Sequence, residues 1–95
     1  MTKNEHTNCP VAKTAQLLSD TWTMLIIRDL LKGSMRFSEL EESLGSISSR
    51  TLTLKLKRLE EEAIIIKSNL HYALTPRGKK LKKIIEAMES WGKTI

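Results

Sequence analysis

Basic residues that could bind a polyanion gather in two short stretches of the chain. Residues 48–58 hold four cations and no acid: Arg50, Lys55, Lys57 and Arg58. Residues 77–83 hold five more: Arg77, Lys79, Lys80, Lys82 and Lys83. The net charge is +5 and the pI is about 9.6. This distribution favours a nucleic acid partner, although two solvated helix faces would show the same pattern.

The single cysteine, Cys9, is the other side chain with chemistry of its own. It precedes Pro10 at the expected start of a helix, where free N–H groups favour a reactive thiolate. Lys13 lies one turn further on, and His6 lies three residues earlier. Redox sensing is one interpretation, and a small buried apolar side chain is the alternative. A lone cysteine excludes an internal disulfide and an all-cysteine zinc site.

The remaining residues do not form a catalytic or metal-binding motif. His6 and Cys9 have a ligand-like spacing, but only His71 could add a third soft ligand, and no spacing supports it. The sequence shows no nucleophile paired with a base and no phosphate-cradling loop. We therefore expect no enzyme, no cofactor and no metal ion.

The elements that must position the basic residues belong to one small domain. The chain has 95 residues, of which 40% are apolar, and this suits a single folded unit. No apolar run reaches the ~18 residues of a membrane helix, and the N-terminus lacks the apolar core of a signal peptide. We expect a cytoplasmic protein, associated with the nucleoid, that does not bind a membrane.

A polar arm and two helix signals come first in the chain. Residues 1–8 are expected to form a flexible polar arm ahead of the domain at 9–95. Pro10 suits the first turn of a helix that ends near Asp20. Asp20 could cap a second helix that runs to about Leu31.

A helix-turn-helix is predicted next. Ser38 and Glu41 form a capping box for a short helix that ends near Leu44. A connector that contains Gly45 leads to a helix over about 48–63, capped by Ser48. The inward stripe of this second helix has helical spacing: Leu52, Leu56 and Leu59.

A short hairpin and a long helix complete the predicted fold. β-Branched residues predict two strands within 64–74, with a turn at Ser68-Asn69. Thr75 is expected to cap one long helix over about 75–94. The fold class is therefore mainly α with a small β-hairpin, a winged helix-turn-helix with a long C-terminal dimerisation helix. The last helix carries a heptad-like apolar seam with little left to pack on: Leu81, Ile84, Ile85, Met88 and Trp91.

Specific residues in this order resemble the HxlR-type winged helix-turn-helix transcriptional regulators of bacteria and archaea. The resemblance runs from residue 9 to about 92. Its main stretches are Cys9-Pro10-Val11-Ala12-Lys13-Thr14, Leu25-Ile26-Ile27-Arg28-Asp29-Leu30 after Trp22, Arg36-Phe37-Ser38-Glu39-Leu40, Leu56-Lys57-Arg58-Leu59-Glu60, and Tyr72-Ala73-Leu74-Thr75-Pro76-Arg77-Gly78. The wing is shorter than is usual in this family, because only residues 67–71 separate the strands.

The resemblance implies a homodimer that binds a roughly palindromic operator in double-stranded DNA. The interface would be built from the first and last helices, with Val11 and the apolar seam. Several family members use a cysteine at the place of Cys9 as a redox or electrophile sensor. No effector pocket can be read from the sequence.

The helix at 48–63 would enter the major groove in such a complex. Arg50 is the candidate for base readout, because its fork can pair with guanine O6 and N7. Thr51 and Thr53 could contact a thymine methyl or a phosphate. The free N–H groups beside Ser48 and Ser49 would favour a phosphate. The remaining expected backbone contacts are Arg36, Lys55, Lys57, Arg58, Lys67, His71 and Arg77.

The preferred interpretation is a dimeric transcriptional regulator that binds a specific DNA sequence and acts as a repressor. The alternative is a winged-helix protein-interaction module that does not bind specific DNA. The short wing favours this alternative. A non-specific architectural DNA-binding protein is the third alternative, and the concentration of basic residues on one helix disfavours it.

Overall fold

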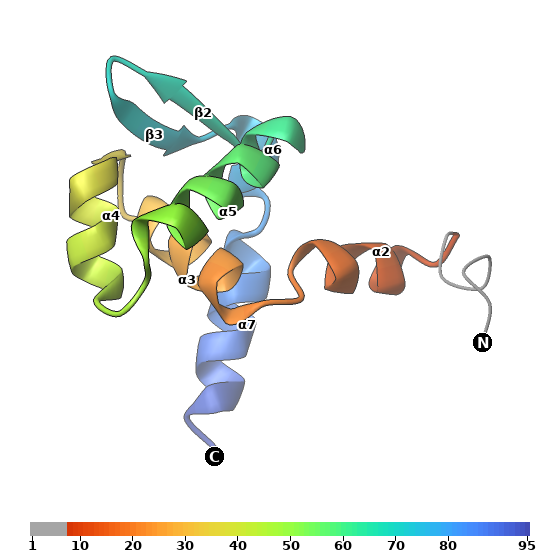
Figure 1. Ribbon diagram of the computed structural model, residues 1–95. Coiled ribbons are helices and arrows are strands. Elements are labelled where there is room, and N and C mark those ends of the chain that lie inside the picture. The colour runs from red at the N-terminus through yellow and green to blue at the C-terminus, as the bar shows by residue number, and fades with distance from the viewer. Residues whose placement is uncertain (1–7) are drawn as a thin grey trace.

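The computed structural model describes residues 8–95, so most of the arm expected at 1–8 lies outside the described residues. Figure 1 shows a group of helices with a small sheet at one edge, and labels the first described helix α2. The helices are α2 (Pro10–Leu17), α3 (Thr21–Leu30), α4 (Phe37–Leu44), α5 (Ser49–Glu61), α6 (Pro76–Lys79) and α7 (Lys82–Gly92). The strands are β1 (Met35–Arg36), β2 (Ile65–Ser68) and β3 (His71–Leu74). This is the winged helix-turn-helix that the sequence predicts.

The sheet has one strand more than the predicted hairpin. Its order is β1-β3-β2 and both pairings are antiparallel, with Met35 opposite Tyr72 and Ile65 opposite Leu74. Two residues are too few to stand out from the sequence, so β1 was not predicted. It ties the segment before α4 to the wing.

The tip of the wing lies one residue later than predicted. Asn69 and Leu70 form the turn, and both have positive φ, at 50° and 67°. Two consecutive residues with positive φ are typical of a type I′ hairpin turn, whose twist matches that of the strands. Ser68, placed in the turn by the sequence, instead ends β2.

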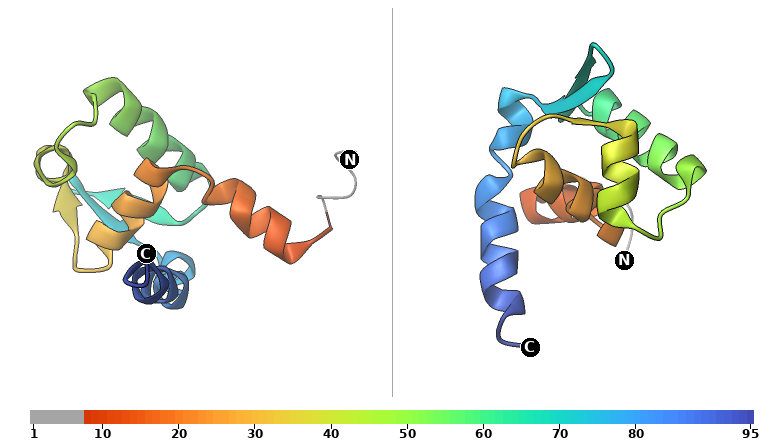
Figure 2. Two further views of the ribbon diagram at one scale, coloured as in Figure 1. Left: turned by 90° about the horizontal axis from the view of Figure 1, so that it is seen from below. Right: turned by 90° about the vertical axis from the view of Figure 1, so that its left-hand side faces the viewer.

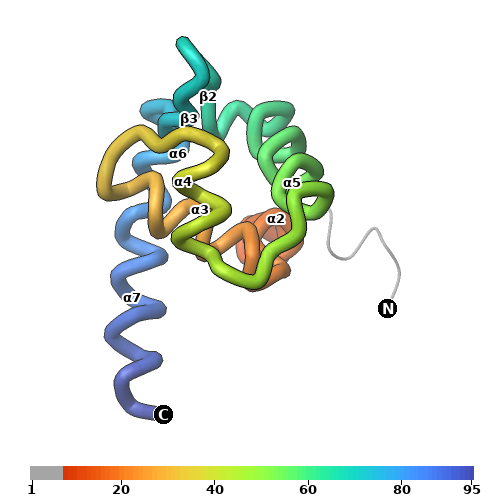
Figure 3. Tube along the Cα trace, turned by 60° about the vertical axis from the view of Figure 1, so that its left-hand side comes forward, coloured from red at the N-terminus to blue at the C-terminus, as the bar shows by residue number. Residues whose placement is uncertain are grey.

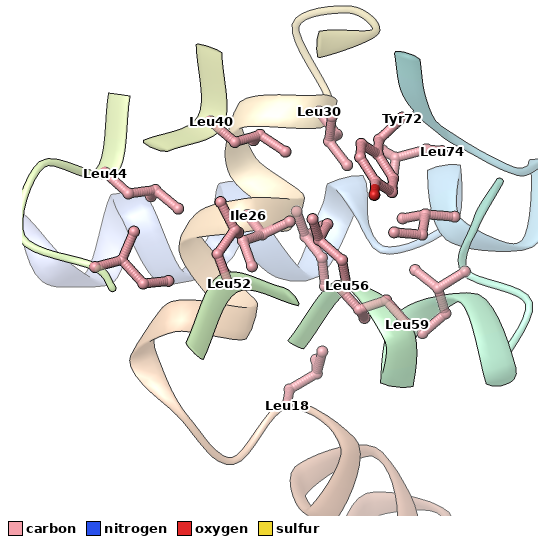
Figure 4. Packing of buried hydrophobic residues seen from close by; sticks show 14 residues of the cluster. Leu18, Ile26, Leu30, Leu40, Leu44, Leu52, Leu56, Leu59, Tyr72 and Leu74 are labelled. Carbon is pink, nitrogen blue, oxygen red and sulfur yellow. The ribbon is translucent and has the colours of Figure 1, made fainter. Parts of the chain in front are cut away.

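The core is one apolar cluster built around α3 (Figure 4). Ile26 and Ile27 of α3 are fully buried, and α5 contributes the predicted inward stripe, Leu52, Leu56 and Leu59. Full burial of such side chains stabilises a fold by about 1.5–3 kcal/mol each. The stripe therefore fixes which face of α5 turns outward.

The helix caps confirm two of the predicted starts and correct a third. Asp20 accepts a hydrogen bond from Thr23 N, and Ser48 accepts one from Thr51 N, at 2.8 and 3.0 Å. The capping box predicted from Ser38 to Glu41 is wrong. Helix α4 begins at Phe37, and Glu39, in its first turn, accepts a hydrogen bond from Arg36 N at 2.8 Å. Pairing of Arg36 in β1 sets this earlier start.

The single helix predicted over 75–94 is also wrong, because the chain divides it into α6 and α7. Thr75 caps α6 as expected, accepting from Gly78 N at 3.0 Å. At the break, Lys80 N and Leu81 N bond three residues back rather than four. This tighter turn bends the path where α6 meets the sheet.

Helices α2 and α7 project from the body of the domain (Figure 2). No residue of either helix is fully buried. Figure 3 shows α7 and α5 on opposite sides of the domain. A surface on α7 is therefore remote from the outward face of α5. No helix of residues 8–95 is long and apolar enough to cross a membrane.

Candidate nucleic-acid interface

Helix α5 presents a basic face on the side opposite its buried leucines. Arg50, Thr53, Leu54 and Lys57 are all exposed, and their spacing puts them on neighbouring turns of one surface. In the part of the chain that the structure describes, Arg50 and Lys57 make no ion pair. Their charged ends are therefore available to an external anion.

Leu54 is the member of this face that the sequence analysis missed. Its side chain is 58% exposed, although an apolar residue in a helix is usually assigned to the core. The signal was present in the spacing, because Leu54 lies four residues after Arg50 and outside the stripe of buried leucines. An apolar side chain here can contact a thymine methyl group.

The serine and threonine side chains at the N-terminus of α5 make more hydrogen bonds within the domain than the sequence suggests. Ser48 Oγ accepts from Thr51 N and donates to Thr51 Oγ1 at 2.9 Å. The Ser49 hydroxyl donates to the carboxylate of Glu41, in α4. Thr53 Oγ1 donates to the carbonyl of Ser49 at 2.8 Å. The bond from Ser49 to Glu41 thus joins α5 to α4 and puts a negative charge beside Ser49, while the other bonds order the first turn of α5.

Lys55 differs from the other cations of α5. Its ammonium lies 3.1 Å from the carboxylate of Asp20, at the start of α3. Burial alone would raise the pKa of Asp20, but hydrogen bonds from Thr23 and the charge of Lys55 outweigh it, and the pKa is lowered. The structure therefore gives Lys55 a partner within the domain, where the sequence analysis placed a phosphate contact.

Arg58 and Arg77 lie toward the far end of α5, away from Arg50. Arg77 Nε donates to the carbonyl of Glu62 at 3.1 Å, just after the last turn of α5. A cation there offsets the partial negative charge of the helix end. Arg58 is exposed and, together with Lys55, lies on the flank of α5 that faces α2.

The wing carries its basic residues beside its own aromatic and backbone groups. Lys67 Nζ lies 5.4 Å from the centroid of the Tyr72 ring. His71 Nδ1 is 2.9 Å from the carbonyl of Asn69, and Arg36 is opposite His71 in the sheet. Leu70 at the tip is 64% exposed. Arg36 and His71 therefore share one face of the sheet, whereas Lys67 lies with Tyr72 on the other face.

A buried carboxylate next to the helix-turn-helix was not foreseen. Asp29 is 2% exposed and accepts from Arg28 Nε and Nη2 at 3.0 and 2.8 Å. Its other oxygen accepts from Ser43 Oγ at 2.7 Å, which links α3 to α4. The sequence does contain a signal for this site, namely an acidic residue inside the apolar run of α3. A carboxylate in such a position is buried only when other groups pair with it.

Cys9 is the N-terminal cap residue of α2 and is exposed. Its side chain makes no capping hydrogen bond. The alternative of a buried apolar cysteine is therefore wrong for this structure. Residues 8–95 contain no cluster of three acidic, histidine or cysteine side chains that could hold a metal ion, and His6 lies outside the described residues.

An apolar surface runs along α2 and α7. Val11, Met88 and Trp91 are 76%, 48% and 68% exposed, whereas Leu81, Ile84 and Ile85 are half-buried against the core. Two apolar hollows of about 760 and 750 Å³ lie here, one between α2 and Ile84 and one along the outer part of α7. The predicted seam is thus divided: its first half packs inside the domain and its second half is uncovered.

Comparisons with known proteins agree on one group. A model of the HxlR-like helix-turn-helix matches residues 17–95. The HTH-type transcriptional regulator YvaP of Bacillus subtilis is 36% identical, over 93% of this chain and 89% of its own. Quinone-bound YodB from B. subtilis superposes with a TM-score of 0.84 at 33% identity, covering 92% of this chain and 100% of that one. The redox regulator HypR in its oxidised form gives 0.85 at 30% identity, with coverage of 92% and 97%.

Proposed function

The chain belongs to the HxlR-like helix-turn-helix family of transcriptional regulators, and from this premise we propose that it is a homodimeric repressor that binds a specific, pseudo-palindromic DNA operator. The observation that carries the proposal is the exposed face of α5, where Arg50 and Lys57 stand out on a helix anchored by three buried leucines. A dimer of this domain can repress by occupying a promoter. Because the operator is chromosomal DNA, the repressor would work in the cytoplasm, together with the chromosome.

Arg50 reads a base in this proposal, and Lys57 neutralises a phosphate. Arg50 lies in the first turn of α5, the part of a recognition helix that reaches base edges. A bidentate contact to guanine is worth about 1–3 kcal/mol of discrimination. Leu54, between them, contributes an apolar base contact. The wing residues Arg36, Lys67 and His71 contact the backbone beside the major groove.

Lys55, Arg58 and Arg77 contribute less to DNA binding in this proposal than the sequence alone suggested. Lys55 supports α5 through Asp20, and Arg77 supports it through the carbonyl of Glu62. Ser48, Ser49 and Thr51 orient the first turn of the helix through their mutual and neighbouring hydrogen bonds. Free N–H groups of that turn, rather than the serine hydroxyls, would then meet a phosphate.

The homodimer forms through the apolar surface of α2 and α7. Val11, Met88 and Trp91 are exposed apolar side chains beside two apolar hollows, a combination typical of an interface. Because α7 lies on the side of the domain opposite α5, pairing through α7 leaves both recognition helices free (Figure 3). Two such helices related by a two-fold axis would read two half-sites of a palindrome.

Cys9 is the proposed redox-responsive residue of the dimer. Its exposure at the start of α2 gives an oxidant access, and α2 is also part of the apolar surface. The oxidised HypR and quinone-bound YodB structures among the relatives support this role. Oxidation would abolish or strengthen DNA binding in the wild type but leave a Cys9→Ser variant unchanged. Equal responses of the two proteins would contradict the role.

The first test compares DNA from upstream of the protein's own gene with a scrambled duplex, at two salt concentrations. Arg50→Ala should lose the preference between the two duplexes. Lys57→Ala should weaken binding to both about equally and lower the salt slope by ~1. Equal loss of preference in both variants would contradict the division of roles. Absence of DNA binding by the wild type would favour a protein-interaction module instead.

A further inference from the structure

A polar hollow of about 380 Å³ lies between α2, the end of α5 and α6. It is lined by four residues of α2, by Arg58 and Glu62 from the α5 end, and by Arg77 of α6. The α2 side chains that line it include Lys13, on the side of α2 turned away from Val11. The hollow and the apolar surface proposed for the dimer therefore lie on different sides of α2, with Thr14 lining both.

Three cations from three elements line this hollow together with a single carboxylate, that of Glu62. Within residues 8–95 the ion pairs are Arg28 with Asp29 and Lys55 with Asp20, so Lys13, Arg58 and Arg77 have no carboxylate partner within 4 Å. Three like charges in one hollow repel one another, and a single carboxylate offsets only part of that repulsion. The arrangement is thus favourable when an anion occupies the hollow.

The Arg77 guanidinium is held in place for such a contact. Its Nε donates to the Glu62 carbonyl at 3.1 Å, which leaves its terminal amino groups available. Guanidinium groups pair with phosphate and carboxylate oxygens through charge-assisted hydrogen bonds, and a lysine adds a mobile point charge. The volume is at the lower end of the ~300–1,000 Å³ typical of small-molecule sites.

We propose that this hollow binds a small anion with a phosphate or carboxylate group, held by Lys13, Arg58 and Arg77. The site adjoins the DNA-reading face, since Arg58 lies one turn after Leu54, but it lies against α2 and includes neither Arg50 nor Lys57. A bound anion joins α2, which belongs to the proposed dimer surface, to the recognition helix. Binding therefore selects one placement of α2 against α5, which gives the regulator an effector site.

The test is a titration of the 95-residue chain with inorganic phosphate in the absence of DNA, followed by NMR. We expect saturable shifts of the amide signals of residues 13–17, 58–62 and 77, and none with chloride at equal ionic strength. Lys13→Ala and Arg58→Ala should each weaken phosphate binding about tenfold, the loss expected for one charge-assisted hydrogen bond. Lys79→Ala is the matched control, because this exposed cation of α6 does not line the hollow.

Two results would overturn the proposal. One is a linear, non-saturating response, or equal weakening by Lys79→Ala, since either indicates diffuse attraction to a basic surface. The other comes from adding a short mixed-sequence DNA duplex: if the duplex displaces phosphate from the hollow, the three cations are a DNA-backbone contact. Phosphate that stays bound while the duplex shifts Arg50 and Lys57 supports the proposal. Because the phosphate titration needs no DNA, a protein that fails to bind DNA would contradict the proposed function without deciding this site.

Discussion

Replacing Gly78 by alanine should destabilise the domain, although alanine is the better helix former. Gly78 is buried in α6, where the helix passes directly over the strand connection at Ile64. A Cβ at this position would overlap the Ile64 carbonyl oxygen and crowd Leu74 Cδ2 at 3.0 Å. The contact is with backbone, so a side-chain rotation cannot relieve it.

The loss of stability in Gly78→Ala can be estimated from the displacement of the Ile64 carbonyl. The Ile64 carbonyl accepts hydrogen bonds from Thr75 N at 2.9 Å and from Thr75 Oγ1 at 3.1 Å. Displacing it weakens two bonds worth about 0.5–1.5 kcal/mol each and adds overpacking strain of about 1–3 kcal/mol. Alanine recovers at most about 1 kcal/mol of helix propensity. We expect a net loss of roughly 2 kcal/mol, or about 10 °C in Tm for a chain of this size.

Urea unfolding followed by circular dichroism, at one fixed chain concentration, measures this loss. Gly92→Ala is the control, because a Cβ at Gly92 in the last turn of α7 meets nothing within 4 Å in its own chain. Both variants are compared at a concentration where the chain is monomeric, since Gly92 lines the hollow of the proposed dimer surface. The same substitution should there be neutral or stabilising by up to about 1 kcal/mol. If Gly78→Ala were as stable as the wild type, the close approach of α6 to Ile64 would be refuted.

Two further predictions concern the supports of the recognition helix and the dimer. Asp20→Asn keeps the cap but removes the ion pair with Lys55, so it should cost about 0.5–1 kcal/mol at neutral pH. Because the pKa of Asp20 is lowered in the folded state, this contribution is complete above the unfolded pKa of ~3.9 and is lost as the pH falls through the folded pKa. A difference in unfolding free energy between the wild type and Asp20→Asn that stays constant down to pH 2 would contradict this prediction. Trp91→Ser should raise the dimer dissociation constant about 100-fold or more by sedimentation equilibrium, because each of two indole groups loses apolar contact. Ser90→Ala, at a neighbouring exposed position, should leave the dissociation constant unchanged, and an equal effect of both would place the interface elsewhere.

The sequence predicted the helical framework well, because its signals are local. Asp20 and Ser48 are strong cap residues, and each lies just before an apolar stripe that needs no distant partner to be recognised. The failures depend on tertiary contacts. Ser38 lost its predicted cap because β1 pairs with the wing and starts α4 earlier. The last helix breaks at Lys80 and Leu81, just after Gly78 packs against the segment that leads into β2.

The candidate interface was predicted in part for the same reason. Periodicity put Arg50 and Lys57 on the outward face of α5, since the buried leucines determine that face. It could not assign Lys55, because the partner, Asp20, lies 35 residues away in the chain. Leu54 was overlooked because hydrophobicity suggested the core, while its angular position on the helix places it outside.

Helix α5 thus has three faces, and their arrangement argues for communication between DNA and the rest of the dimer. One face is buried by Leu52, Leu56 and Leu59, and a second exposes Arg50 and Lys57. The third faces the α2–α3 segment, with the ion pair of Lys55 and Asp20 and with the polar hollow that Arg58 and Glu62 line. A buried apolar face resists displacement, whereas a polar face held at few points can shift at low cost. Changes in α2, whether from an anion in the hollow or from chemistry at Cys9, should therefore reach the recognition helix through this third face.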